Sequence, residues 1–313
     1  MALPPNSTDE ILISRLEDEL YGSGFVTPDP AVFHGAELFA MEIRRIFFAN
    51  WTLLDYADRF TSARDCRLYD VAMRSLVVVR SYERQFHALR NRCLHAAYPV
   101  ILDDQLTAGD KLTCAYHGWQ YALDGKLLHA PHVDAAASAG MGLARYGVTR
   151  HGGLLYLQPV SDSLTSPAQT FIKRSDTTGA SLEFHVERIS IDANWKKLAW
   201  VLHDCVQAAF EVPRAGIQIY GAFNLYINDG EESAIIRLIP VSNNQTKLTI
   251  TQTQPSTRAS RHPQVRSKLE HHLRTALSET PFTDNAATQT ALAQFNNWYL
   301  TALTSCTPKE TNE

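Results

Sequence analysis

Four residues in two short segments constrain this chain more than any other feature of its sequence. Cys93 and His95 lie two positions apart in the first segment, and Cys114 and His117 lie three apart in the second. Thiolates and imidazoles are ligands for both zinc and iron–sulfur clusters. Zinc sites with two cysteines and two histidines usually have both cysteines in one segment and both histidines in another. Here each segment offers one cysteine and one histidine. The mixed pairs therefore favour a two-iron cluster, with a structural zinc site or four unrelated buried residues as the alternatives.

The two segments resemble the ligand loops of Rieske [2Fe-2S] proteins, Cys-x-His followed by Cys-x2-His. The Gly-Trp pair after the second histidine is similar to that of Rieske oxygenases. The resemblance implies that Cys93 and Cys114 hold the inner iron and that His95 and His117 hold the outer one. It also implies an electron-transfer cofactor whose potential lies above that of an all-thiolate cluster, because imidazoles replace two thiolates.

The length and composition fit a globular redox protein with two domains. The chain has 313 residues, a formal net charge of −4 and 45% hydrophobic residues, so neither a nucleic acid nor a membrane is expected as a partner. Its first ten residues lack the basic and apolar regions of a signal peptide, and no run reaches the roughly 18 apolar residues of a membrane span. Beyond the motif, Cys66, Cys205 and Cys306 are expected to be reduced thiols, which predicts a cytoplasmic protein.

The resemblance to the large (alpha) subunits of Rieske oxygenases extends over most of the chain and predicts an α+β protein. Residues 1–50 are expected to form N-terminal helices, and 51–160 an all-β Rieske domain. Serine, threonine and proline predict a linker over 161–180. Residues 181–306 are expected to form a smaller-than-usual antiparallel sheet with helices, the helix-grip domain of oxygenase catalytic domains. Residues 307–313 are a tail.

Hydrophobic periodicity places helices and strands within this plan. Helices are expected at 8–21, 36–48, 263–278 and 286–304, and their apolar stripes are expected to face the core. Strands are expected at 67–71, 75–80, 86–91, 119–123, 126–129, 152–159, 181–191, 218–227, 234–241 and 246–254. The Asp124-Gly125 pair predicts a hairpin. One departure from the oxygenases lies just before Phe86, where Glu83-Arg84 replaces their common Asp-Gly.

The resemblance also implies a second metal site, and the chain departs from its pattern there. In the oxygenases the segment after the linker begins Asn-Trp-Lys, as residues 194–196 do, and continues to an acidic residue and two histidines. Those histidines and a distant carboxylate hold a mononuclear Fe(II). On that spacing Asp204 matches the acidic residue, which bridges neighbouring subunits, but Gln207 and Val212 replace the histidines. The sequence therefore predicts a degenerate mononuclear iron site.

Two further sets of residues bear on this second site. Asp284 is a candidate third ligand because it precedes an expected helix, where helix capping explains it better. His203, Gln207 and Glu211 lie four apart, so on a helix they share a face and form a candidate displaced metal site. An ordinary polar helix face is the alternative, and we prefer it because a lone histidine on such a face is usually solvated.

These features support three functions. The first is a Rieske-type oxidoreductase that passes electrons from a reductase or ferredoxin through the cluster towards O2-dependent oxidation of a small organic substrate. Its own catalysis depends on a partner or an unconventional site that supplies mononuclear iron. The second is a companion electron-transfer or structural subunit in a hetero-oligomer, and the third is a zinc-stabilised binding module. The resemblance implies a trimer-based homo- or hetero-oligomer, and it identifies neither the substrate nor the reductase.

Overall fold

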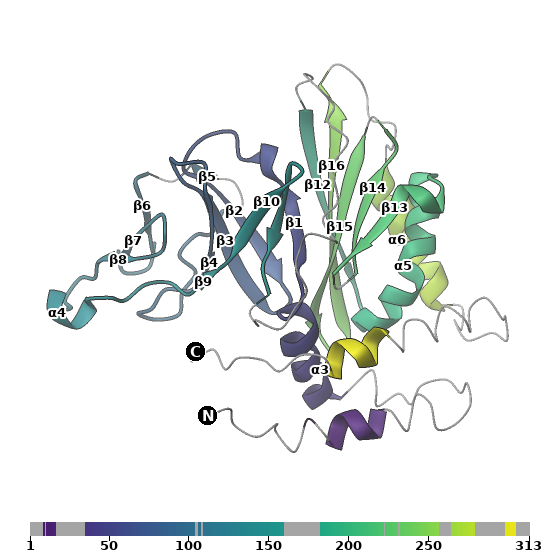
Figure 1. The fold of residues 1–313 in the computed structure, drawn as a ribbon, viewed down its shortest axis with the longest axis horizontal. Helices are drawn as coiled ribbons and strands as arrows, with labels where there is room; N and C mark the ends of the chain where they lie inside the picture. Colours follow the sequence, from purple (N-terminus) through teal and green to yellow (C-terminus); the bar gives the residue numbers. More distant parts are fainter. Residues whose placement is uncertain are drawn as a thin grey trace. The chain divides into compact units, whose positions relative to one another are not determined.

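The structure is a computed structural model that describes residues 9, 11–16, 35–103, 106–107, 109–159, 182–221, 223–230, 232–256, 264–278 and 298–304. These residues form two compact units (Figure 1). The cluster unit holds residues 52–158, and the sheet unit holds the described residues up to 51 and from 159 onward. The expected linker and tail, as well as Asp284 and Cys306, lie outside the described residues.

The cluster unit consists of three antiparallel sheets built from short strands. A five-stranded sheet has the order β5-β2-β3-β4-β9, and two three-stranded sheets have the orders β1-β11-β10 and β6-β7-β8. The elements are β1 (Thr52–Tyr56), η2 (Ala57–Arg59), β2 (Asp65–Val71), β3 (Arg74–Arg80), β4 (Phe86–Arg90), β5 (Leu106–Thr107), β6 (Lys111–Thr113), β7 (Gln120–Ala122), β8 (Leu127–His129), α4 (Ala135–Ser138), β9 (Arg145–Tyr146), β10 (Val148–His151) and β11 (Leu154–Leu157).

The sequence of β3 explains its central place in the five-stranded sheet. Residues Leu76 to Val79 are four consecutive apolar residues, and all are fully buried. A strand with a neighbour on each edge and a covered surface on each face selects such β-branched and aliphatic residues. Its neighbours β2 and β4 carry the residues that lead into the turns and into the first ligand loop.

The expected hairpin at Asp124-Gly125 is confirmed. The Asp124 carboxylate accepts a hydrogen bond from the amide of Lys126 at 3.1 Å, and β7 and β8 pair antiparallel across the turn. Gly125 has a φ of +92°, and a Cβ there would lie 2.8 Å from a methyl group of Leu89. Only glycine meets both the backbone and the packing requirement at this turn.

The sheet unit contains one five-stranded antiparallel sheet with the order β12-β16-β15-β14-β13. Its strands are β12 (Leu182–Ile191), β13 (Ile217–Tyr220), β14 (Asn224–Asn228), β15 (Ser233–Ser242) and β16 (Gln245–Pro255). The expected single strand at 218–227 is wrong, since the structure divides it into β13 and β14, which pair with each other. Gly221 and Phe223 have φ values of +53° and +57°, and this left-handed backbone reverses the chain.

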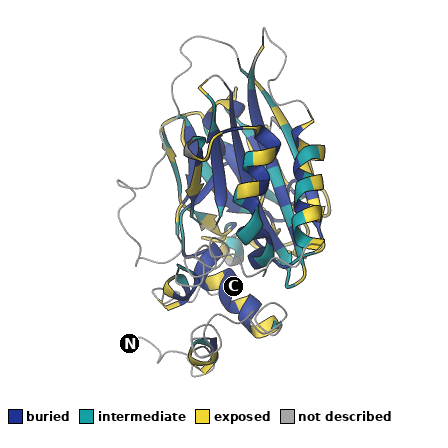
Figure 2. Ribbon diagram, turned by 90° about the vertical axis from the view of Figure 1, so that its right-hand side faces the viewer, coloured by how far each residue is buried: buried dark blue, intermediate teal, exposed yellow. Residues whose placement is uncertain are grey.

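Two helices, α5 (Trp195–Phe210) and α6 (Val265–Ser278), run along one face of this sheet with their outer sides exposed (Figures 1 and 2). Asn194 caps α5, because its side-chain oxygen accepts a hydrogen bond from the amide of Lys196 at 2.9 Å. The apolar stripe of α6 is core as expected, with Val265, Leu269 and Leu273 buried. The antiparallel sheet with its helices confirms the expected α+β fold.

Further described helical segments lie in the N-terminal and C-terminal parts of the chain and before β13. The expected helix at 36–48 consists of α3 (Ala36–Glu42) and a π-helical turn η1 (Ile43–Phe47). Residues 9, 11–16 and 298–304 are helical, and the rest of the two helices expected around them lies outside the described residues. A short 3-10 turn, η4 (Arg214–Gly216), precedes β13. Within the described ranges, no helix has the length and apolar character needed to cross a bilayer.

A buried carboxylate, Glu42 at the end of α3, joins three distant parts of the sheet unit. It is 0% exposed. Lys196 donates to one of its oxygens at 2.6 Å, and Tyr299 donates to the same oxygen. Trp195 donates from Nε1 to the other oxygen at 2.7 Å. The Trp-Lys pair after Asn194 therefore anchors α5 to α3.

The groups around Glu42 are held in defined protonation states by their surroundings. Burial lowers the pKa of the Lys196 ammonium, and the Glu42 carboxylate opposes this by raising it. Burial raises the pKa of the Tyr299 hydroxyl well above its usual value, and Glu42 raises it further. Tyr299 therefore stays protonated and donates. A similar buried group in the cluster unit holds Asp55, which accepts hydrogen bonds from Arg59 and from Tyr69.

Candidate metal centre

The two ligand segments form loops with the same backbone hydrogen bonds. The first loop follows β4, and the second joins β6 to β7. In each loop the amide of the cysteine donates to the carbonyl five residues later, from Cys93 to Tyr98 at 2.8 Å and from Cys114 to Trp119 at 2.9 Å. The cysteine carbonyl in turn accepts from the amide four residues later, at 3.0 Å in both loops. The repeated geometry presents the two cysteines in equivalent positions.

The fourth residue after each cysteine is the one that turns the loop back. Gly118 has a φ of +70° and Ala97 has a φ of +57°. Glycine occupies this left-handed region freely, whereas alanine does so at a cost of about 1 kcal/mol. The equivalence of a glycine and an alanine in this conformation indicates that the turn itself, rather than the residue type, is required in both loops.

The four expected ligands divide into a buried pair and an exposed pair. Cys93 and Cys114 are 3% and 1% exposed and belong to one core cluster with Leu89, Leu112 and Tyr121. The imidazoles lie at the surface, with the Nδ1 atoms of His95 and His117 3.0 Å apart. The His95 ring also stacks on the Trp119 ring at 5.4 Å between centroids. The loops thus bring the two imidazoles together and enclose both thiols.

Asn91 fixes the base of the first ligand loop. Its side-chain oxygen accepts hydrogen bonds from the amides of Val100 and Ile101, both at 2.9 Å, and its side-chain nitrogen donates to the Ile101 carbonyl at 2.8 Å. The side chain thereby closes the ten-residue loop that contains Cys93 and His95. This role could not be read from the sequence, because a single asparagine before a loop carries no pattern.

Tyr121 on β7 links the second loop to the first. Its hydroxyl accepts a hydrogen bond from the amide of Leu94 at 3.1 Å and lies 3.2 Å from Sγ of Cys93. Burial raises the pKa of Tyr121, and the contact with Cys93 raises it further, so the hydroxyl keeps its proton. Since the oxygen accepts from Leu94, the O–H is free to donate to the sulfur.

Tyr121→Phe is expected to lower the reduction potential of the bound cluster by some tens of millivolts. A hydrogen bond to a ligand sulfur stabilises the more negative, reduced state, and loss of about 1 kcal/mol of that preference corresponds to about 40 mV for one electron. Voltammetry of the purified protein measures the change. Tyr116→Phe is the control, because Tyr116 lies exposed beside His117. An unchanged potential in Tyr121→Phe would contradict the assigned hydrogen bond.

The side chains fit a two-iron cluster better than one zinc ion. Two nitrogens that share a metal at about 2.1 Å are about 3 Å apart at a right angle, which the Nδ1 atoms of His95 and His117 match. A Rieske cluster needs two protein ligands on each iron, whereas zinc needs four around one point. Over the described part of the chain, no three or more His, Cys, Asp or Glu side chains are grouped to hold one ion. The pairwise arrangement therefore suits the cluster.

In the described part of the chain, the residues of the candidate second metal site are not grouped around one point. Asp204 is exposed and pairs with Arg214 and with Nδ1 of His203, at 3.4 Å for the histidine. Val212 is buried in the apolar core, 5% exposed. Glu211 has a φ of +56° at the end of α5 and accepts a hydrogen bond from Lys268 at 2.7 Å. Glu211 therefore lies past the helix, so the expected shared face of His203, Gln207 and Glu211 is not continuous.

Comparisons with known proteins agree with this geometry. The Rieske [2Fe-2S] domain family matches residues 50–146. Biphenyl dioxygenase subunit alpha of Metapseudomonas furukawaii is 28% identical over 108 residues, which are 34% of this chain and 23% of that subunit. Chloroplastic choline monooxygenase of Arabidopsis thaliana is 32% identical over 111 residues, 34% of this chain and 25% of that protein. The match thus spans about a quarter of the length of these relatives.

The fold is similar over a longer stretch. The crystal structure of the apo form of the quaternary ammonium Rieske monooxygenase CntA superposes with a TM-score of 0.68 and 14% identity, over 87% of this chain and 94% of that one. At this identity the similarity is one of fold. The chain contains a Rieske [2Fe-2S] domain and is a homologue of the alpha subunits of Rieske oxygenases.

Proposed function

We propose that this chain is the electron-transfer part of a Rieske oxygenase system. Cys93, His95, Cys114 and His117 would hold the cluster, which supplies one-electron transfer when bound. The observation that supports this is the arrangement of the loops, with two buried thiols and two imidazoles at the surface, 3.0 Å apart. The exposed imidazole edge offers a short path for an electron to and from a partner protein, and the core excludes water from the thiols.

The partners and the compartment belong to the same proposal. A reductase or ferredoxin would deliver electrons, and a trimer-based assembly of oxygenase subunits would direct them towards O2-dependent oxidation of a small organic substrate. The cytoplasm is the proposed location, because Cys66 and Cys205, the described cysteines outside the ligand loops, form no disulfide. Burial raises the pKa of the Cys205 thiol to about 12, so this side chain stays protonated and unreactive.

The second candidate is a companion subunit that has no mononuclear iron of its own. The observation that favours it is the buried apolar side chain of Val212 in a position where the oxygenases have a histidine, together with Gln207 in the other. In such an assembly Asp204, exposed on α5, would contact the neighbouring subunit in place of its contact with Arg214. Oxygen chemistry would then take place in a complete oxygenase subunit.

Iron analysis distinguishes a companion subunit from a subunit that has its own mononuclear iron. Purified chain is expected to contain about two irons per polypeptide and a paramagnetic centre after reduction if it is a companion subunit. About three irons, with the third lost in His203→Ala or Glu211→Gln, would instead indicate a displaced mononuclear site. A colourless protein with one zinc per chain would refute the cluster. The measurement is repeated after mixing with any oxygenase subunit that co-purifies.

A further inference from the structure

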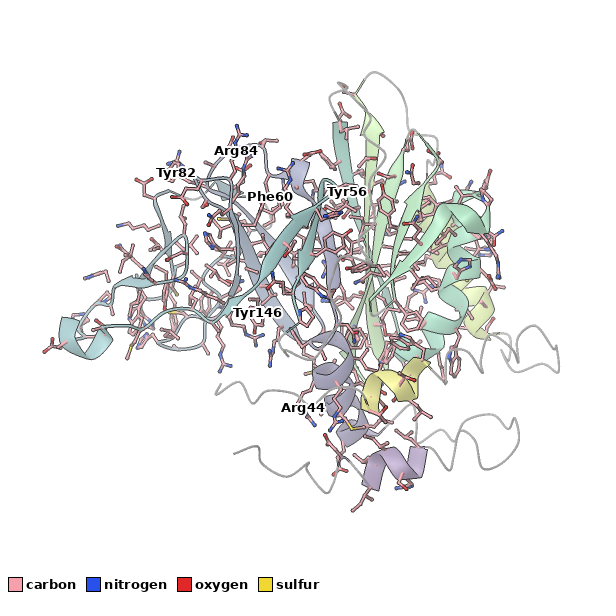
Figure 3. The ribbon with its side chains drawn as sticks, viewed as in Figure 1. Arg44, Tyr56, Phe60, Tyr82, Arg84 and Tyr146 are labelled. Carbon is pink, nitrogen blue, oxygen red and sulfur yellow. The ribbon has the colours of Figure 1, made fainter. Side chains whose placement is uncertain are left out.

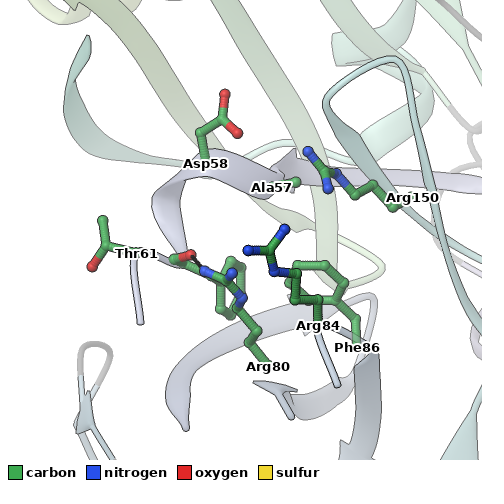
Figure 4. Close-up of a pocket in the computed structure, with 8 residues that line it drawn as sticks. Ala57, Asp58, Thr61, Arg80, Arg84, Phe86 and Arg150 are labelled. Atoms are coloured by element: carbon green, nitrogen blue, oxygen red, sulfur yellow. Dashed lines mark hydrogen bonds between the residues drawn. The ribbon is translucent and has the colours of Figure 1, made fainter. Parts of the chain in front are cut away.

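A second site lies in the cluster unit, in a cavity of about 310 Å³ that the proposed electron transfer does not use. Figure 4 shows three guanidinium groups, those of Arg80, Arg84 and Arg150, extending towards this space. The remaining lining residues are Ala57, Asp58, Phe60, Thr61 and Phe86. The volume lies at the small end of the range for pockets that bind organic ligands.

One side of the cavity, its floor, is formed by packed apolar side chains. Phe60 is 1% exposed, and its ring meets the ring of Phe86 edge to face at 5.3 Å. Ala57 lies in the short helix η2, which is fixed by the buried contact of Arg59 with Asp55. Such a floor takes up the ring or the hydrocarbon part of a ligand rather than a hydrated inorganic ion.

The three arginines differ in how they are held. Arg80 donates to the Phe60 carbonyl and so ties the end of β3 to the floor of the cavity. Arg84 lies in the β3–β4 turn and Arg150 lies on β10, and both are exposed. Among the residues that the structure describes, neither Arg84 nor Arg150 forms an ion pair or a side-chain hydrogen bond. Two free guanidinium forks beside one apolar floor form a receptor for a carboxylate.

The backbone at Arg84 is a second, independent observation. Arg84 has a φ of +59°, in the left-handed region where glycine is at ease and a long side chain is strained. This is the position where the oxygenases that the chain resembles commonly have a glycine. A strained residue that also places its charge over a cavity indicates that the charge is needed there. Figure 3 shows Arg84 near Tyr82 and Phe60 at the turn end of this hairpin.

The charges at the cavity favour an anion, and its apolar residues favour an organic one. Asp58 is the one carboxylate among its lining residues, so three positive groups outnumber one negative group. Phe60 and Phe86 offer a surface for a ring or a hydrocarbon part, which a hydrated phosphate lacks. We propose that the cavity binds a small organic monocarboxylate, with its carboxylate between Arg84 and Arg150 and its apolar part on Phe60 and Phe86.

The position of the cavity separates this site from the metal centre. Phe86 begins β4, and Cys93 follows its other end, seven residues further along the chain. The extended strand from Phe86 to Arg90 spans about 13 Å, and none of the residues that line the cavity belongs to either ligand loop. Binding in the cavity therefore does not touch the ligand loops, and the proposal stands whether or not the chain transfers electrons.

Calorimetric titration of the full-length protein with benzoate tests the site. Benzoate is expected to bind. Benzamide lacks the charge and is expected to bind at least tenfold more weakly. Inorganic phosphate is also expected to bind more weakly than benzoate. Arg84→Gly and Arg150→Gln are each expected to weaken benzoate about tenfold to a hundredfold, because each removes one charge-assisted contact. Arg84→Gly also restores the residue suited to the turn, so the variant is expected to fold.

A control variant and the affinities for the other probes decide whether the cavity binds the carboxylate. Lys126→Gln removes one positive charge from an exposed turn elsewhere in the cluster unit, and it is expected to leave benzoate affinity unchanged. Equal affinity for benzoate in Arg84→Gly and in the unmodified protein would overturn the proposal, as would equal binding of benzamide. Phosphate that binds as tightly as benzoate would overturn the assignment of an organic ligand. A visible absorption spectrum unaltered by benzoate is expected, since the cavity lies away from the cluster loops.

Discussion

Glu42→Gln is expected to lower the free energy of unfolding of the sheet unit by about 3–5 kcal/mol. The substitution keeps the volume of the side chain but removes the charge that compensates the Lys196 ammonium, which is only 2% exposed. It also replaces one of the two carboxylate oxygens by an NH2 group, which donates instead of accepting. One of these oxygens accepts from Trp195, and the other accepts from both Lys196 and Tyr299. An ammonium left buried and uncompensated accounts for most of the expected loss. Urea unfolding followed by tryptophan fluorescence measures it.

The control is a second Glu–Lys pair of similar length at the surface. Glu211 accepts from Lys268 at 2.7 Å, and both side chains are exposed, by 74% and 42%. Glu211→Gln is expected to cost less than about 1 kcal/mol, because solvent screens exposed pairs. The double variant Glu42→Gln with Lys196→Met should recover part of the loss, since it removes the uncompensated charge. Equal losses in Glu42→Gln and Glu211→Gln would show that burial does not set the strength of the pair.

Part of the order of elements could be predicted because its signals are local. The β-forming residues of β2 and β3 and the alternating apolar residues of β4 specify short strands before the first ligand loop. The helical stripe of α6 likewise identifies its buried face. The one wrong strand, at 218–227, failed because its turn depends on the backbone conformation of Phe223, an aromatic residue that normally favours strands.

The polar clusters could not be predicted because their members are distant in the sequence. Glu42 and its partners Trp195, Lys196 and Tyr299 are separated by more than 150 residues. The Asn-Trp-Lys segment was recognised only through a resemblance, and its contacts explain it physically as a helix cap followed by two donors to one carboxylate. Asn91 and Tyr121 were missed at the metal centre for the same reason, since each acts on a loop through tertiary contacts.

Arg84 illustrates the opposite case, in which the sequence showed a difference but not its meaning. The sequence alone shows that Glu83-Arg84 replaces the Asp-Gly common in the oxygenases. In the structure, Arg84 adopts the left-handed backbone conformation that suits glycine. Conformational strain of this kind depends on the surrounding hairpin and has no signature in a single sequence.

Cys114→Ala is expected to abolish the visible absorption of the protein and to reduce its iron content from about two per chain to near zero. Cys114 and Cys93 are the only buried thiols in the described ligand loops, and an inner iron with one protein ligand would be displaced by solvent. Loss of the cluster also removes the covalent link between the two loops. The melting temperature of the cluster unit should therefore fall further than the loss of one buried sulfur atom alone would lower it.

Cys66→Ala is the matched control for this experiment. Cys66 is 1% exposed, as Cys114 is, and lies in the same core cluster, so both substitutions remove the same atoms from equally buried sites. Its Sγ donates to the Arg64 carbonyl at 3.4 Å and lies outside both loops. Cys66→Ala is expected to keep its iron and its colour and to lose only about 1–2 kcal/mol from the cavity it creates. If both variants lost iron to the same degree, core disruption rather than ligation would be the cause. A Cys114→Ala protein that kept its iron would contradict the assignment of Cys114 as a ligand.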